Sequence, residues 1–131
     1  MENTPRVRLT AVPDDGVLVV RGDELDRVLL AEDTSRFRER FPAWDRYGVS
    51  AFYASSSDEV DALCGSRLMR FDQVAVFRRD DLERAGVEIV PTFRTPHVTL
   101  CHPVLAELVG RLLNCAHTSQ PNPYHVPEEG S

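Results

Sequence analysis

Residues 48–60, Gly-Val-Ser-Ala-Phe-Tyr-Ala-Ser-Ser-Ser-Asp-Glu-Val, decide how this chain of 131 residues folds. β-branched, aromatic and small side chains fill residues 49–54, which is typical of a strand. Ser56 and Glu59 then have the spacing of a capping box, which predicts a helix that ends at Gly65. A strand therefore runs directly into a helix N-terminus, and such a terminus favours an anion such as a diphosphate.

The residues before this stretch predict a hairpin and a helix. Apolar and polar residues alternate over 7–11, and after a run of turn residues a second strand is expected over 17–21. Asp23 is a candidate N-cap for a helix with a break near Asp33. Pro42 should end that helix.

The residues after Gly65 predict further short strands and helices before the chain turns polar. Strands are expected over 73–78, 87–90 and 97–101, and helices over 80–86 and from Pro103 to about Leu112. We therefore predict an α+β fold with a small mixed sheet and flanking helices. A single compact domain should cover residues 1–116, and residues 117–131 should form a polar C-terminal tail.

Composition limits the class of protein. The net charge of −6 argues against broad electrostatic binding of nucleic acid, and we interpret Arg36, Arg38 and Arg40 as a solvated helix face. The sequence contains no membrane span and no signal peptide, which predicts a cytoplasmic protein without a membrane partner. Three cysteines at irregular spacing are expected to be reduced and buried.

The stretch from Gly48 to Glu59 resembles the G-x-x-x-(L/V)-Y-x-S-x-S-P-E motif of RES-domain toxins. These bacterial toxins belong with the ADP-ribosyltransferase-like folds and consume NAD. The resemblance implies that fold and an ADP-ribosyltransferase or NAD glycohydrolase activity. It also implies NAD as substrate and a cognate antitoxin, or another restraining protein, as partner.

The same resemblance implies a set of site residues. An early-strand arginine and the motif tyrosine would hold the dinucleotide, and by position these are Arg21 and Tyr53. The glutamate of the family would fall at Cys64, which leaves Glu88 as the remaining candidate carboxylate. The other candidates are Arg46 as a second phosphate contact, Tyr47, Ser50 and Ser55 around the nucleotide, and His97 lining the pocket.

Two alternatives stay open. His97 and Thr99 fall on one face of a predicted strand, and Pro96 to Leu100 is similar to half of the paired His-x-Thr signature of two-histidine phosphoesterases. A divergent enzyme of that kind would act on RNA or a nucleotide phosphate, although the second half of the signature is missing. The other alternative is a protein-interaction module without enzymatic activity.

No metal is expected. Cys101-His102 and Cys115-His117 form two close Cys/His pairs separated by a predicted helix. Structural zinc usually takes ligands two to four residues apart, and neighbours on a strand point to opposite faces. Buried thiols are the better interpretation of these cysteines.

Overall fold

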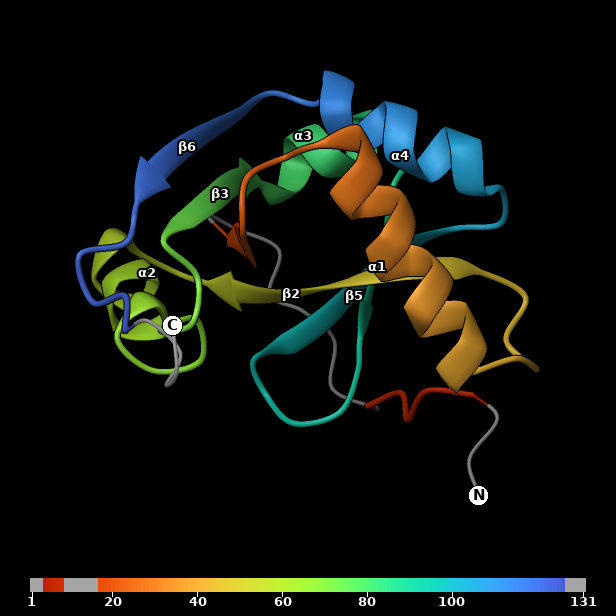
Figure 1. Ribbon diagram of the computed structural model, residues 1–131, viewed down its shortest axis with the longest axis horizontal. Helices are drawn as coiled ribbons and strands as arrows, with labels where there is room; N and C mark the ends of the chain where they lie inside the picture. The colour runs from red at the N-terminus through yellow and green to blue at the C-terminus, as the bar shows by residue number, and fades with distance from the viewer. Residues whose placement is uncertain (1–3, 9–16, 127–131) are drawn as a thin grey trace.

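The computed structural model describes residues 4–8 and 17–126, which form an α+β fold on one six-stranded sheet (Figure 1). The sheet order is β4-β5-β2-β1-β3-β6. The strands are β1 (Leu18–Gly22), β2 (Tyr47–Ala54), β3 (Gln73–Arg78), β4 (Glu88–Pro91), β5 (His97–His102) and β6 (His117–Pro121). The helices are α1 (Arg27–Arg40), α2 (Ser57–Cys64), α3 (Arg79–Arg84) and α4 (Leu105–Asn114).

The α+β prediction is confirmed, but the expected mixed sheet is wrong. All five strand pairings among the described residues are antiparallel. The connection between β1 and β2 explains this direction for one pair. α1 follows the end of β1 and brings the chain back beside that same end. β2 then runs back along β1 in the opposite direction.

Side chains on the two faces of the sheet build two hydrophobic clusters. On one face, Val19, Val49 and Val98 belong to a cluster completed by α1, α3 and α4. On the other face, Val20 and Val74 pack with residues of α2. Figure 1 shows α1 close to α4, and α2 at the opposite side of the view. Successive side chains of a strand point to opposite faces of the sheet. α2 packs on one face, and α1, α3 and α4 pack on the other.

Helix α1 begins later than expected and has no break. Its N-cap is Asp26, whose carboxylate accepts a hydrogen bond of 3.0 Å from the Leu29 N–H, so the predicted cap at Asp23 is wrong. The helix continues through residue 34 because the Thr34 side chain is fully buried. It ends at the C-cap Phe41, just before Pro42, as predicted.

The capping box at the start of α2 is confirmed. The Ser56 side chain accepts a hydrogen bond of 3.3 Å from the Glu59 N–H, and the Glu59 carboxylate accepts one of 3.0 Å from the Ser55 N–H. Two N–H groups at this helix start are thereby bound by side chains of the chain itself. The predicted anion site would compete with these contacts.

The prediction that a tail begins at residue 117 is wrong. Residues 117–121 form β6, which pairs with β3 along its whole length. The polar composition of this stretch is misleading, because strand pairing uses backbone groups and all five side chains are exposed. Asn122 follows as a buried residue. Residues 127–131 of the predicted tail lie outside the described residues.

The predicted N-terminal hairpin falls mostly on residues that the structure does not describe. Of its first strand, Val7 forms an isolated bridge with Thr92. Its second strand is confirmed as β1, whose partners are β2 and β3. β1 is therefore an interior strand of the sheet.

Gly22 closes β1 beneath the ring of Phe71, and this contact leads to a first prediction. A Cβ atom at residue 22 would clash with that ring. We expect Gly22→Ala to lower the free energy of unfolding by about 1–3 kcal/mol, because overpacking forces the ring to move. Urea unfolding followed by circular dichroism measures the effect.

Gly110→Ala in α4 is the matched control. Nothing lies within 4 Å of a Cβ atom at residue 110, and alanine favours a helix. This variant should be as stable as the parent or slightly more stable. Equal unfolding midpoints for the two variants would contradict the close contact at Gly22.

Candidate functional site

A split between β1 and β2 opens the sheet. The two strands pair only from Leu18 to Val20, although β2 pairs with β5 from Tyr47 to Phe52. Beyond Val20, β1 continues along β3 alone. The edge of β2 at Ser50 therefore has no paired residue on β1, and the Ser50 side chain is exposed in the middle of a six-stranded sheet.

A cleft of about 660 Å³ lies at this split. Its walls are α1 and the loop of residues 65–72, and its floor comes from the end of β1 and from Ser50 and Phe52 of β2. The volume lies within the range of small-molecule sites. Its ionisable lining residues are Arg21, Arg36, Arg40, Arg67, Arg70, Asp23 and Asp33. We call this the arginine cleft.

Arg21 is the most buried charged side chain of the arginine cleft. Its side chain is only 5% exposed, and its guanidinium forms an ion pair with Asp33 of α1. One terminal nitrogen lies 3.4 Å from the backbone oxygen of Ser50, which is a long hydrogen bond. Its Nε is buried without a hydrogen-bond partner. Arg21 therefore keeps unused donor capacity beside the cleft.

Asp33 holds two arginines of the cleft together. Its carboxylate pairs with Arg21 and with the exposed Arg36. Burial alone would raise the pKa of Asp33, but the hydrogen bonds and charges of the two arginines outweigh burial and lower that pKa. Asp33 is thus ionised at neutral pH and occupies the position that a bound anion would take next to Arg21.

The three remaining arginines lie over aromatic rings. The guanidinium carbons of Arg40, Arg67 and Arg70 are 5.4, 5.6 and 4.7 Å from the ring centroids of Phe93, Phe52 and Phe71, respectively. None of the three forms an ion pair with a carboxylate among residues 4–8 and 17–126. A chain of net charge −6 therefore gathers uncompensated positive charge at one cleft.

His97 lies beneath this cleft and does not line it. Its Nδ1 shares a hydrogen bond of 2.8 Å with Thr92 Oγ1, which lies 2.7 Å from Thr99 Oγ1. Its ring contacts Phe52 and Phe93 at centroid distances of 5.3 and 5.0 Å. His97 and Thr99 share a face, as predicted, but both are buried in a structural hydrogen-bond network.

The buried state of His97 predicts a pH dependence of stability. Burial, with a smaller effect from nearby arginines, lowers the pKa of His97 to about 4. Between that value and the ordinary value near 6.5, the unfolded chain binds a proton that the folded protein does not. The free energy of unfolding should therefore fall by at most roughly 3 kcal/mol as pH drops from about 6.5 to 4.

Urea unfolding at several pH values measures this slope. His97→Gln should reduce it, because glutamine takes up no proton. His117→Gln replaces an exposed histidine and should keep the slope. A slope that is the same in all three proteins would show that His97 is not the group responsible.

The predicted site residues do not form one cluster. Arg21 and Ser50 meet in the arginine cleft. Tyr53 packs against the cluster on the face of α1 and α4, and Tyr47 lies under the guanidinium of Arg38 at 4.8 Å. Ser55 is at the start of α2, where its N–H is bound by Glu59.

Arg46 and Glu88 lie elsewhere and bind each other. Their contacts include a hydrogen bond of 3.0 Å between Arg46 Nη2 and Glu88 Oε1, and the hydrogen bond from Arg46 lowers the pKa of Glu88. Glu88 belongs to β4, three strands from β1 and therefore roughly 14 Å away across the sheet. This carboxylate is not positioned to act on a ligand held by Arg21.

Most of the arginine cleft lies outside the residues predicted from the sequence. Asp33, Arg36 and Arg40 have the spacing of neighbours on one helix face, so a pattern was present. We interpreted these arginines as solvated because nothing in the sequence shows a second wall facing them. Arg67 and Arg70 supply that wall from a loop.

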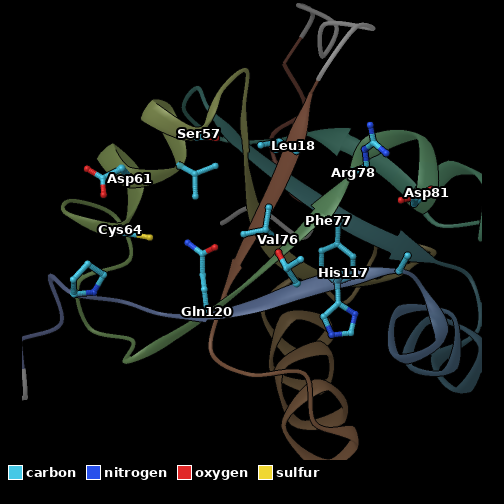
Figure 2. A pocket seen from close by; sticks show the side chains of 14 residues that line it. Leu18, Ser57, Asp61, Cys64, Val76, Phe77, Arg78, Asp81, His117 and Gln120 are labelled. Atoms are coloured by element: carbon cyan, nitrogen blue, oxygen red, sulfur yellow. The ribbon is translucent and has the colours of Figure 1, made fainter.

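A second cavity of about 650 Å³ lies on the other side of β1 (Figure 2). Leu18 and Val76 form its floor, Asp61 and Cys64 of α2 lie at one end, and Gln120 of β6 lies at its rim. Positive charge does not gather there, because its one arginine is accompanied by two aspartates. The arginine cleft is therefore the stronger candidate.

No protein-family model, curated protein or solved structure matches the chain. Within the described part of the chain, no helix is long and apolar enough to cross a membrane. Nor do the described residues place three or more His, Cys, Asp or Glu side chains where they could hold a metal ion. The function is therefore argued from the arginine cleft itself.

Proposed function

We propose that the arginine cleft binds NAD or a related nucleotide. The supporting observation is Arg21, a buried guanidinium with an unpaired Nε, in a cleft lined by four further arginines. Guanidinium groups bind phosphate oxygens in a bidentate manner. A diphosphate at Arg21 and Arg36 would replace the carboxylate of Asp33 as their partner.

The floor of the cleft suits the rest of a nucleotide. The exposed Ser50 hydroxyl can donate to or accept from a ribose hydroxyl or a phosphate oxygen. The half-buried ring of Phe52, which lies beneath the guanidinium of Arg67, adds an apolar surface to the floor. In this proposal Ser50 keeps its predicted role as a nucleotide contact, and Phe52 instead of Tyr53 is the aromatic residue that lines the cleft.

Cleavage of NAD would also need a carboxylate to stabilise positive charge on the ribose. Of the two carboxylates in the cleft, Asp33 is neutralised by two arginines, which leaves Asp23. Asp23 forms no ion pair among the described residues and has a positive φ of 77°. The toxin role, an ADP-ribosyltransferase-like fold and a restraining protein partner rest on the sequence resemblance alone.

Isothermal titration calorimetry with NAD and with ADP-ribose tests the proposal. We expect saturable binding that weakens as salt is raised, because the contacts are ionic. Chromatography of the same mixtures for free nicotinamide tests cleavage, with Asp23→Asn as the variant that should abolish it. A folded protein that binds neither ligand would contradict the proposal and favour the interaction module.

A further inference from the structure

We propose that Arg40 and Arg67 form a second phosphate subsite at one end of the arginine cleft. The ligand would then be a nucleotide that carries a ribose monophosphate in addition to its diphosphate. This inference rests on the proposed nucleotide site at Arg21, and it specifies the class of nucleotide.

The two arginines come from opposite walls of the cleft. Arg40 comes from α1 and lies over Phe93, whereas Arg67 comes from the loop after α2 and lies over Phe52. Both rings contact His97, at centroid distances of 5.0 and 5.3 Å. The rings beneath the two guanidiniums therefore belong to one aromatic cluster around His97.

Neither guanidinium is neutralised by the protein. In the described ranges, Arg40 and Arg67 have no carboxylate partner, whereas Arg21 and Arg36 share Asp33. The hydrogen bond from Arg67 to the backbone oxygen of Thr95 is long, at 3.4 Å. Two unpaired guanidiniums that face one region form a site for an anion with several acceptor oxygens.

The charge of the cleft exceeds that of a simple dinucleotide. Five arginines and two aspartates line it. A dinucleotide diphosphate brings about two negative charges, and a phosphate monoester adds about 1.5 to 2 more at neutral pH. The lining therefore carries a net charge of +3, and about one positive charge remains after a diphosphate binds, which favours one further phosphate over none.

Calorimetric titration of the full chain with NAD and NADP tests the subsite. We expect NADP to bind at least about tenfold more tightly than NAD, because charge-assisted hydrogen bonds to Arg40 and Arg67 are added. In the double variant Arg40→Gln, Arg67→Gln this affinity ratio should fall to near one. Arg70→Gln removes a charge of the same cleft over Phe71, outside the pair over Phe93 and Phe52, and should preserve the ratio.

Adenosine 2′,5′-bisphosphate and 5′-AMP form a second pair of probes that lack a diphosphate. A preference for the bisphosphate that depends on Arg40 and Arg67, without any binding of NAD or NADP, would support the subsite and overturn the dinucleotide proposal. Equal affinities within both pairs would overturn the subsite. The same holds if no probe binds, or if Arg70→Gln removes the preference as fully as the double variant does.

Discussion

Arg21→Met should weaken the binding of ADP-ribose by at least about a hundredfold. Methionine fills a similar volume but removes the buried guanidinium, and with it two or more charge-assisted hydrogen bonds to the diphosphate. Arg21 contributes most because it is 4% exposed, so that its contacts are little screened by water. Calorimetric titration gives the affinity, and circular dichroism shows whether the variant folds.

Two further variants test whether binding depends on charges of the cleft itself or on the overall charge of the protein. Arg84→Met removes an arginine of α3 that is 74% exposed and paired with Asp81, and it should bind ADP-ribose as the parent does. Asp33→Asn removes the carboxylate that competes for Arg21 and should strengthen binding. If Arg21→Met and Arg84→Met had the same affinity, Arg21 would not be part of the site.

Asn122→Ala should produce the largest loss of stability among the variants proposed, about 3 kcal/mol. The side-chain amide nitrogen of Asn122 lies 3.1, 2.9 and 3.1 Å from the backbone oxygens of Cys64, Leu68 and Phe71, so that its two hydrogens are shared among three acceptors. Alanine would leave these oxygens without that donor in a buried environment, which costs about 1–3 kcal/mol for a single group. Urea unfolding measures the loss.

The same variant should disturb the arginine cleft. The three carbonyl groups belong to the end of α2 and to the loop that carries Arg67 and Arg70, so Asn122 fixes one wall of the cleft. Asn114→Ala, at the exposed end of α4, is the matched control and should change neither stability nor binding. An unfolding midpoint of Asn122→Ala equal to that of the control would contradict the anchoring role.

The parts of the fold that depend on neighbours in sequence were predictable. The strand and helix over residues 47–64 follow from side-chain alternation and from the capping box at Ser56, which act within a few residues. β6 was not predictable, because its polar side chains carry no strand pattern and its pairing with β3 is a property of the backbone. The polar side chains of residues 117–121 therefore predicted a tail, whereas these residues form the edge strand of the sheet.

The candidate site was predictable only in part. Arg21 and Ser50 were candidates named from the sequence resemblance, and both line the cleft. The cleft itself arises because β1 leaves β2 after Val20, and no sequence pattern marks that separation. Arg67 and Arg70 lie more than forty residues from Arg21, so only the folded chain shows that they belong together.

The anchoring of one cleft wall by Asn122 also has a consequence for biosynthesis. The ribosome synthesises the chain from its N-terminal side, so Arg21 and α1 leave the exit tunnel well before Asn122 does. Until Asn122 emerges and donates to the loop of residues 65–72, that wall has no anchor. The nascent chain should therefore be unable to hold the proposed nucleotide until Asn122 has emerged.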